Sequence, residues 1–210
     1  TGGAGYIGSH MVKKLIKSGH EVKVIDDLST GNEWAVSKDI LYKINLLDTK
    51  SLLNFFENNK IDGVFHFAAK SIVSESIIQP NDYYLNNVAG SINLVNAMIK
   101  NNINKIIFSS TAAVYGSQIV SPISEKVDKI PINPYGKSKL MIENIIKDMS
   151  QLELLQSISF RYFNAAGASF DTDIGEAHKL ETHLIPNIIN SYLNKKSFKI
   201  FGNSFNTNDG

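Results

Sequence analysis

The chain opens on the segment TGGAGYIG (residues 1–8), and this segment decides the fold. Its glycines repeat every three residues at Gly2, Gly5 and Gly8, and Gly3, Gly5 and Gly8 also match the pattern G-x-G-x-x-G. Glycine there lets the backbone turn tightly, approach a pyrophosphate closely and pack a helix closely on a sheet. The helix N-terminus then offers N–H groups and the positive end of its dipole to the phosphates. We therefore expect a dinucleotide-binding loop.

A loop of this kind normally follows a buried strand, but no strand precedes residue 1. The last residues, Asp209 and Gly210, resemble no natural ending. We therefore expect a trimmed chain that lacks the first strand of its sheet.

The composition limits the possible functions. At 210 residues the chain can hold one sizeable core, or one domain and part of another. A net charge of +1 gives no electrostatic reason to expect a nucleic-acid partner. The absence of cysteine excludes disulfides, thiolate metal sites and cysteine nucleophiles. No cluster of histidine, aspartate and glutamate stands out in the sequence, and we expect no metal site.

Hydropathy gives no sign of a membrane segment. No apolar run reaches the roughly 18 residues of a transmembrane helix, and no signal peptide is visible. Because the beginning of the chain reads as trimmed, the second observation carries little weight. We expect a cytoplasmic protein without a membrane partner.

Strands alternate with helices along most of the chain, which predicts an α/β fold with a doubly wound parallel Rossmann sheet. After residue 164 the pattern loosens. We expect a cofactor-binding domain over residues 1–164 and the truncated beginning of a smaller substrate-binding domain over 165–210. The expected strands cover residues 21–26, 40–44, 63–68, 105–109, 157–163 and 198–201. One helix is expected to follow the glycine loop and end at Gly19, and another to begin at Asn133-Pro134; further helices are expected over 49–59, about 82–101 and 186–193. Residues 167–180 are expected to form a loop.

Asp26 is the candidate for binding the adenosine ribose. It stands 18 residues after Gly8, at the end of the second expected strand, near the spacing of about 20 residues typical of this acid. A carboxylate there repels the 2′-phosphate of NADP and so favours NAD. Asp27 is a second candidate for the same role. The alternative reading is an acid that merely begins a polar loop.

The segment YGKSK (135–139) contains a Tyr-x-x-x-Lys pair. On a helix these positions share a face, so Tyr135 and Lys139 project together. A phenol with a pKa near 10 is a poor base at neutral pH, and a nearby ammonium and a cationic nicotinamide would stabilise the phenolate. Lowering the phenol pKa by about three units, or roughly 4 kcal/mol, would bring it near the working pH. The alternative is an ordinary surface pair on an amphipathic helix.

Hydroxyl side chains end an earlier strand, in the segment FSST (108–111). A hydroxyl there can bond a substrate hydroxyl and assist proton movement, whereas the alternative reading is turn chemistry after a strand. The order of glycine loop, acid, hydroxyl strand end and Tyr-x-x-x-Lys favours an enzyme.

The chain resembles the nucleotide-sugar enzymes of the extended short-chain dehydrogenase/reductase superfamily, and among them the UDP-glucose 4-epimerase family. The resemblance covers the whole chain and corresponds to roughly the first two-thirds of a family member. It is carried by TGGAGYIGSH (1–10), HFAAKSIVSES (66–76), YYLNNVAG (83–90), FSSTAAVYG (108–116), NPYGKSKLMIE (133–143), RYFNAAGA (161–168), HLIP (183–186) and IFGNSFNTNDG (200–210).

The resemblance implies an isomerase that interconverts UDP-galactose and UDP-glucose with tightly held NAD. Tyr135 would take the proton of the sugar 4-hydroxyl while hydride passes from C4 to NAD⁺; the 4-keto sugar would then rotate and be reduced on its other face. Lys139 would tune Tyr135 and bind the nicotinamide ribose, and Thr111 would be the hydroxyl partner. The catalytic residues implied are Tyr135, Lys139 and Thr111.

The same resemblance implies the binding residues. Asn45 stands where the family usually has an aspartate beside the adenine. The implied cofactor contacts are Gly2, Gly5, Tyr6, Ile7, Gly8, Asp26, Asp27, Asn45, Leu46, Phe67, Ala68, Ala69, Asn86, Ser109, Tyr135, Lys139 and Tyr162, and the implied substrate contacts are Thr111, Tyr135, Asn164, His183, Leu184 and Phe201. His66 is interpreted as a packing histidine.

Other functions remain open. Related dehydratases carry an Asp-Glu pair directly after the strand-end threonine, where this chain has Ala112 and Ala113. Alanine cannot transfer protons, which argues for simple epimerisation. Epimerases of UDP-N-acetylglucosamine, UDP-glucuronate or UDP-pentoses stay possible, and a non-catalytic dinucleotide sensor is the rival from another class.

The family often forms homodimers through two long helices. Here these would be residues 82–101 and 138–154, with apolar faces that core packing explains equally well. A homodimer is therefore expected for the full-length protein. The apolar residues are Ile92, Val95, Ile99, Ile142, Ile145 and Ile146.

Overall fold

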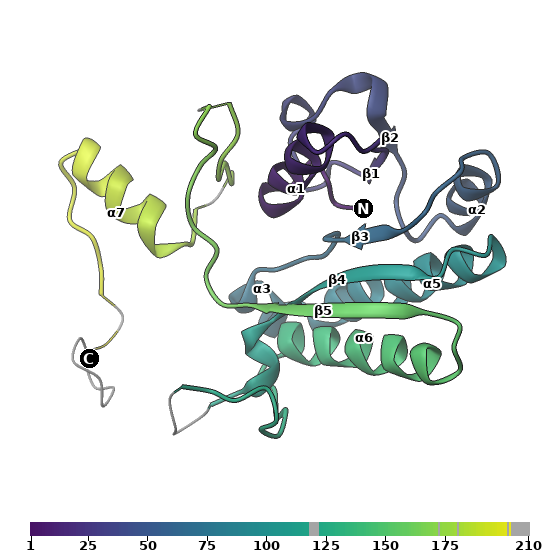
Figure 1. Ribbon diagram of the computed structural model, residues 1–210. Coiled ribbons are helices and arrows are strands. Elements are labelled where there is room, and N and C mark those ends of the chain that lie inside the picture. Colours follow the sequence, from purple (N-terminus) through teal and green to yellow (C-terminus); the bar gives the residue numbers. More distant parts are fainter. Residues whose placement is uncertain (118–121, 172, 180, 201, 203–210) are drawn as a thin grey trace. The chain divides into compact units, whose positions relative to one another are not determined.

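The computed structural model describes residues 1–117, 122–171, 173–179, 181–200 and 202 (Figure 1). The chain divides into two compact units, Thr1–Ala165 and Ala166–Gly210.

The first unit contains parallel strands, as the alternating pattern predicts. Strand β1 (Val24–Asp26) pairs with β2 (Leu41–Lys43). A second sheet has the order β3 (Val64–His66), β4 (Lys105–Thr111), β5 (Gln156–Tyr162). All described pairings are parallel, with Ile25 opposite Tyr42 and Phe65 opposite Ile107. The predicted α/β fold class is confirmed, although several strands are shorter than expected.

Helices connect these strands and follow the expected order (Figure 1). They are α1 (Tyr6–Lys17), α2 (Thr49–Glu57), α3 (Val73–Ile78), α4 (Pro80–Tyr83), α5 (Gly90–Lys100) and α6 (Pro134–Gln151), with 3₁₀ turns η1 (Glu33–Ala35), η2 (Lys38–Ile40) and η4 (Ala112–Tyr115) and the π-helical turn η3 (Tyr84–Ala89). Asn133 caps α6 as predicted, because its side chain accepts a hydrogen bond from Gly136 N at 2.8 Å.

The core lies where α2 and α6 each pack against α5 and where α6 packs against β4 and β5. The spacing of Leu52, Phe55 and Phe56 on α2 predicts one buried face, and all three are buried. Leu94 and Met98 on α5 and Ile142 and Ile146 on α6 supply the facing surfaces, with Ile106 and Phe108 from β4 beneath them.

The glycine loop is seated against both β1 and β3. Gly2 N donates to Ile25 O at 2.8 Å, and Phe67 N donates to Thr1 O at 3.0 Å. Gly2 has φ +71°, and a Cβ there would lie 2.4 Å from Ala68 N. A Cβ on Gly8 would lie 2.1 Å from Gly2 O. Only glycine therefore permits the helix to begin so close to the two strands.

The helix expected over residues 82–101 differs in detail. It forms as α4, the wide π turn η3 and α5, preceded by the unexpected short helix α3. The wide turn contains Asn87, whose buried side chain bonds Lys70 N at 2.8 Å and Lys70 O at 3.0 Å. This tertiary pairing, which local sequence does not encode, accompanies the departure from α-helical geometry.

A cavity of about 890 Å³ lies between the two sheets. It is lined by the edge residues of β1 and β3, by Val12 and Leu15 of α1 and by Phe55 of α2. None of the expected proton-transfer residues lines it.

The second unit contains α7 (Leu184–Leu193), which begins two residues earlier than expected. The described parts of 167–180 form no helix or strand, in agreement with the expected loop. The strand expected at 198–201 is wrong for residues 198–200, which form none, and Phe201 lies outside the described residues. Among the helices of the described residues, none is long and apolar enough to cross a bilayer.

A charged network fastens α6 to the second sheet. The Glu143 carboxylate accepts from Arg161 Nε at 2.9 Å, from Arg161 Nη2 at 2.7 Å and from Ser110 Oγ at 2.5 Å. Arg161 Nη1 also donates to the Tyr115 hydroxyl at 2.8 Å. The Glu143 side chain is only 9% exposed, so these partners take the place of the water that would otherwise solvate it. The network thereby joins α6, β4, β5 and η4.

Replacing Glu143 with glutamine leaves the Arg161 guanidinium uncompensated in a poorly solvated position. We expect E143Q to lower the free energy of unfolding of the full-length protein by about 3 kcal/mol, measured by chemical denaturation. Glu57→Gln, at an exposed glutamate, is the matched control and should change it little. Equal stability of the two variants would contradict the role given to the network.

Candidate functional site

The expected proton-transfer residues meet at the carboxyl end of β4. Tyr135 and Lys139 lie one turn apart on α6. The Thr111 side chain lies close enough to the Tyr135 hydroxyl to lower its pKa, and Lys139 Nζ donates to Ser109 O at 2.8 Å. The side chains that share a helix face therefore reach two positions on the same strand end. The shared helix face of Tyr135 and Lys139 is what their i, i+4 spacing predicts.

Burial dominates the electrostatics of this strand end. Lys139 is 2% exposed, and this burial lowers its pKa to about 7. Its Nζ also lies 4.9 Å from the centre of the Phe108 ring. Burial raises the Tyr135 pKa, while the nearby Thr111 side chain opposes that rise. The lowered tyrosine pKa expected from sequence is not present in the protein alone, because Lys139 is directed at a carbonyl and burial outweighs the effect of Thr111.

Thr111 also shapes the backbone after β4. Its hydroxyl oxygen accepts from Ala113 N at 3.1 Å and so caps η4. Ala112 and Ala113 both lie in this turn. No proton-transferring side chain occupies these two positions, as the sequence indicates.

Asp26 closes the glycine loop from the end of β1. Its Oδ2 accepts from Ala4 N at 3.0 Å and its Oδ1 accepts from Leu28 N at 2.9 Å. The carboxylate thus has a structural role, in agreement with the alternative interpretation of Asp26 as an acid that begins a polar loop. Each carboxylate oxygen has a second lone pair, so Asp26 can still accept hydroxyl groups.

The ends of β1 and β2 come together beside Asp26. Asp27 Oδ2 accepts from Asn45 Nδ2 at 2.7 Å, and Asn45 Oδ1 accepts from Leu47 N at 2.8 Å. Leu46 is buried and joins the core. Asp27 and Asn45, named from different segments of the sequence, therefore form one polar edge.

The amino end of α1 fits the diphosphate of a dinucleotide. Gly5 is its N-cap and has no side-chain cap, and no acidic residue occupies the first turn. The dipole and the first-turn positions Tyr6, Ile7 and Gly8 therefore favour an anion. With Asp26 placed for a ribose, the donors and acceptors suit an adenine dinucleotide.

Other expected cofactor contacts lie after β3 and on η3. Phe67, Ala68 and Ala69 follow β3, and Ala68 packs against Gly2. Asn86 lies on η3 and donates from Nδ2 to Asn87 Oδ1 at 2.9 Å.

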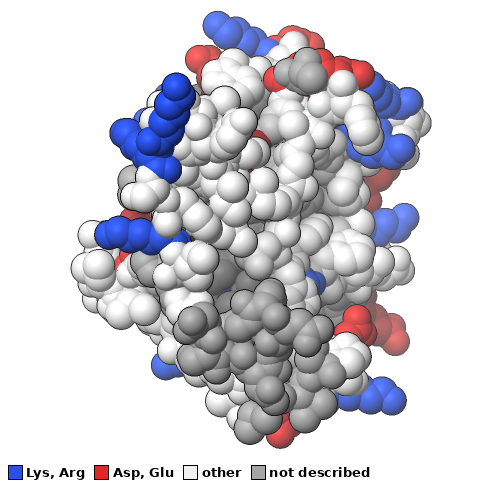
Figure 2. All heavy atoms as spheres, turned by 90° about the vertical axis from the view of Figure 1, so that its left-hand side faces the viewer, with Lys and Arg blue, Asp and Glu red and all other residues white. Residues whose placement is uncertain are grey.

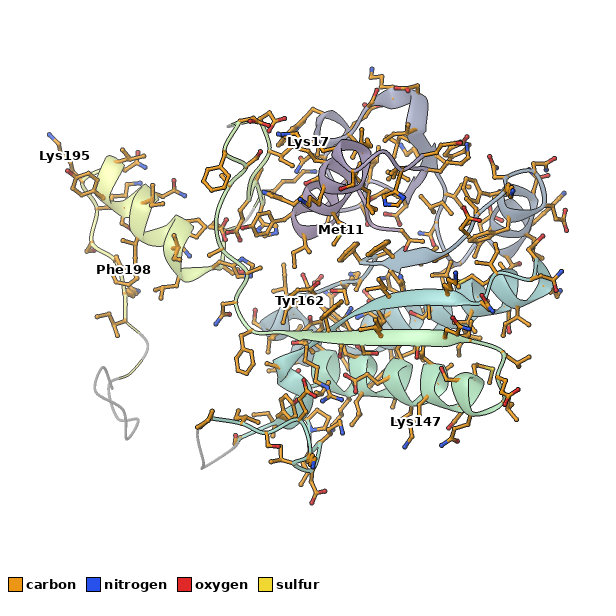
Figure 3. All side chains as sticks on the ribbon, viewed as in Figure 1. Met11, Lys17, Lys147, Tyr162, Lys195 and Phe198 are labelled. Atoms are coloured by element: carbon orange, nitrogen blue, oxygen red, sulfur yellow. The ribbon has the colours of Figure 1, made fainter. Side chains whose placement is uncertain are left out.

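The remaining expected contacts belong to different units. Tyr162 ends β5 (Figure 3), and burial raises its pKa. Asn164 is exposed in the first unit. His183 and Leu184 lie at the start of α7 in the second unit, and Phe201 lies outside the described residues.

His66 is confirmed as a packing histidine. It is 1% exposed, and its ring nitrogens bond Thr1 Oγ1 and Ser91 Oγ, each at 2.7 Å. Burial, with a smaller contribution from the Lys139 charge, holds its pKa well below the usual value. His66 is therefore neutral and held in place.

Sequence reasoning missed two features. Asn87 also bonds Ser138 Oγ at 3.2 Å and so links the loop after β3 to α6, but the sequence gives no sign that it, rather than Asn86, is buried. The second feature is a cluster of side chains before α7 that are able to ligate a metal ion. The pattern E-x-H-x-x-E-x-H at positions 176–183 of the sequence could have indicated it.

Figure 2 shows the distribution of charge on one face. Both basic and acidic side chains among the described residues are visible in this view. The net charge of the full sequence is +1, so neither sign of charge dominates.

Comparison with known proteins identifies relatives along the whole chain. A family model described as the NAD dependent epimerase/dehydratase family matches residues 1–209. The UDP-glucose 4-epimerase of Lactobacillus helveticus is 46% identical over 211 residues, which cover 100% of this chain and 64% of that protein.

Solved structures give the same likeness. UDP-glucose 4-epimerase from Brucella ovis in complex with NAD has a TM-score of 0.95 and 39% identity, covering 100% of this chain and 65% of the other. The enzyme from Bifidobacterium longum in complex with NAD⁺ and UDP has a TM-score of 0.92 and 32% identity, covering 99% of this chain and 66% of the other. The chain thus spans about 64% of the length of the curated relatives it matches.

The buried ammonium predicts a specific pH dependence. In the cofactor-free protein the folded-state pKa of Lys139 is about 7, against 10.5 for an ordinary lysine. Between these values the unfolded state binds a proton that the folded state does not, so stability rises with pH. From about pH 7 to about pH 9.5 the full-length protein should gain roughly 3 kcal/mol relative to Lys139→Met.

Unfolding in urea at the two pH values measures this difference. Lys147→Met, at an exposed lysine on the same helix, is the control and should show no such gain. A wild-type-minus-K139M difference that does not change with pH would contradict a buried lysine with a lowered pKa.

Proposed function

We propose that this chain, which belongs to the NAD dependent epimerase/dehydratase family, is the cofactor-binding and proton-transfer part of a UDP-glucose 4-epimerase. The enzyme would interconvert UDP-galactose and UDP-glucose. The observation that carries the proposal is the meeting of Tyr135, Thr111 and Lys139 at the end of β4. The relatives named UDP-glucose 4-epimerase support it.

Tyr135 and Thr111 would handle the proton of the sugar 4-hydroxyl. Thr111 orients that hydroxyl by hydrogen bonding, and Tyr135 accepts its proton and later returns it. When bound, NAD supplies the acceptor and donor of hydride at C4. Epimerisation needs no other acid or base, which agrees with alanine at positions 112 and 113.

Positive charge would make Tyr135 a usable base. Burial alone raises its pKa, so the protein needs a compensating cationic field in the working complex. Lys139, one helical turn away, is the nearest source on the same helix face. A cationic nicotinamide beside the phenol would add to that field. The base is thus activated when the cofactor binds.

NAD is the proposed cofactor, with Asp26 as the reason for its selection over NADP. The Asp26 side chain is held by Ala4 N and Leu28 N, so it cannot turn away from an added phosphate. A fixed carboxylate would repel the 2′-phosphate and accept bonds from ribose hydroxyls. Residues 1–165 would bind NAD, and residues 166–210 would begin the nucleotide-sugar-binding part.

A homodimer through η3, α5 and α6 is proposed for the full-length protein. Val95, Ile142 and Ile146 are buried in the core, as the alternative reading of these apolar faces held. Ile92 and Met141 remain 39% and 44% exposed and would be available for a second copy. We also propose a cytoplasmic location, because a chain without cysteine suits a reducing compartment.

Removing the phenol hydroxyl tests the proton-transfer role. Tyr135→Phe in the full-length protein should lower kcat for UDP-galactose epimerisation about 10²–10⁴-fold, with NAD still bound in stoichiometric amount. Tyr192→Phe, at a tyrosine that is 82% exposed, is the control and should retain full turnover. Unchanged turnover in Y135F would overturn the assignment, and NAD binding without any epimerase activity in the wild type would favour a sensor.

A charge in the proposed contact tests the dimer. Ile92→Lys should halve the mass measured by sedimentation of the full-length protein, because a lysine cannot be buried there without a partner. Ile130→Lys, at a residue 66% exposed elsewhere, should leave the mass unchanged. A wild-type monomer, or a dimer that persists in I92K, would contradict this interface.

A further inference from the structure

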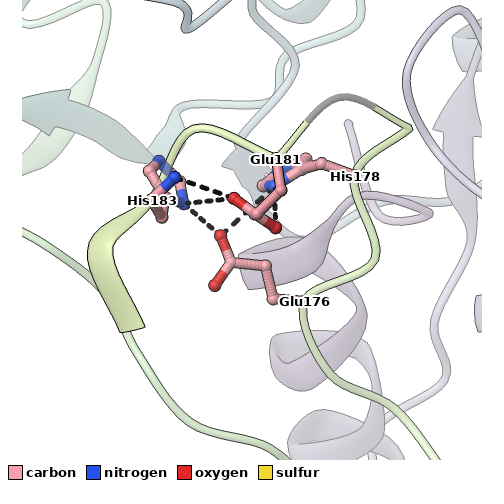
Figure 4. Close-up of side chains that lie close together, drawn as sticks. All are labelled: Glu176, His178, Glu181 and His183. Carbon is pink, nitrogen blue, oxygen red and sulfur yellow. Dashed lines mark hydrogen bonds and ion pairs between the residues drawn. The ribbon is translucent and has the colours of Figure 1, made fainter. Parts of the chain in front are cut away.

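Four metal-ligating side chains converge in the loop before α7 (Figure 4). One ligand atom from each lies within 4.8 Å of the others. They come from an eight-residue stretch of the second unit, and the proposed reaction uses none of them as an acid or base. The four are Glu176, His178, Glu181 and His183.

Two of the separations between these ligand atoms, both made by His178, are close to the edge of a zinc tetrahedron. His178 Nδ1 lies 3.2 Å from Glu176 Oε1 and 3.6 Å from Glu181 Oε2. His183 Nδ1 contacts Glu176 Oε1 and lies 4.0 Å from Glu181 Oε1. Zinc bonds of about 2.0–2.2 Å to nitrogen and oxygen place neighbouring ligands about 3.3–3.6 Å apart in a tetrahedron. Small shifts of these side chains would therefore complete the coordination.

Backbone groups already orient one of the ligands. Glu181 Oε1 accepts from Thr182 N and from His183 N, each at 2.8 Å. Its carboxylate is therefore fixed with Oε2 toward His178. Hydrogen bonds of this kind orient ligands and restrict their rotamers in metal sites. The Glu176 and Glu181 side chains are 7% and 14% exposed, so the carboxylates sit largely out of water.

Charge and donor type select the ion. Two carboxylates carry two negative charges, which a divalent cation neutralises while neutral imidazoles donate nitrogen lone pairs. Two nitrogen and two oxygen donors suit Zn²⁺, whereas Mg²⁺ and Ca²⁺ prefer oxygen alone. Four protein ligands fill a tetrahedron and leave no open position for catalysis.

We propose that these four side chains form a structural Zn²⁺ site that ties Glu176, His178 and Glu181 to the first turn of α7. His183 is the N-cap residue of this helix, so its coordination fixes where α7 begins. The His183 ring would then be a metal ligand, and its sequence-predicted contact with the nucleotide sugar would pass to its backbone and to Leu184. The zinc site rests on the loop geometry and not on the proposed epimerase activity.

Metal analysis of the full-length protein tests the site. Protein stripped with chelator and dialysed against Zn²⁺ should retain one Zn²⁺ per chain by elemental analysis, and Zn²⁺ should raise its Tm. Co²⁺ in its place should give the visible absorption typical of tetrahedral coordination. Loss of Zn²⁺ on dialysis against metal-free buffer, or an octahedral Co²⁺ spectrum, would overturn the proposal.

Matched variants locate the metal. Glu176→Gln and His178→Gln should each abolish the Zn²⁺-dependent rise in Tm, whereas His20→Gln and Glu57→Gln, at exposed positions outside the cluster, should retain it. A Zn²⁺ response unchanged in E176Q and H178Q would place the ion elsewhere and contradict the site. NAD content and epimerase turnover, measured on the same samples, keep a failure of this site distinct from a failure of the proposed function.

Discussion

The contact between Gly8 and the Gly2 carbonyl is the constraint on which the first unit depends. A side chain at either position would collide with backbone rather than with a flexible neighbour. Because both lack one, residues 1–8 can touch β1 and β3 together and begin α1 at the strand ends. Asp26 then bonds the loop from the end of β1. The amino end of α1 and the Asp26 carboxylate, which we propose to bind the diphosphate and the ribose of NAD, are thus positioned by the same close packing.

The position of α6 depends on a separate set of polar contacts. This helix is held to the second sheet by the Glu143–Arg161 network and to the loop after β3 through Ser138 and Asn87. These contacts on its core-facing side leave Lys139 almost without solvent. Desolvation of the ammonium is unfavourable in the protein alone, and a negatively charged or polar cofactor contact would offset it. The packing of α6 therefore buries the lysine that we propose to act in catalysis.

The sequence predicted the parts of the fold that have strong local signals. Glycine spacing, the Asn133 cap and the apolar face of α2 each correspond to a local physical requirement, and each is confirmed. Strand lengths were less predictable because a strand ends where hydrogen bonding to the neighbouring strand ends, and this depends on tertiary context.

Tertiary contacts explain what the sequence did not reveal. The π turn η3 coincides with Asn87 bonding a distant backbone segment, and no periodicity encodes that. The Glu-His cluster before α7 had a readable spacing, but in an irregular loop such spacing does not determine which way side chains point. The raised pKa of Tyr135 likewise follows from burial and not from its neighbours in sequence.

The proposed epimerase is tested most directly by incubating the full-length protein with UDP-galactose, without added NAD, and following the sugar by NMR. Retained cofactor and a reversible hydride transfer predict that UDP-glucose appears until the two sugars reach equilibrium. Absence of UDP-glucose from protein shown to contain NAD would contradict the account.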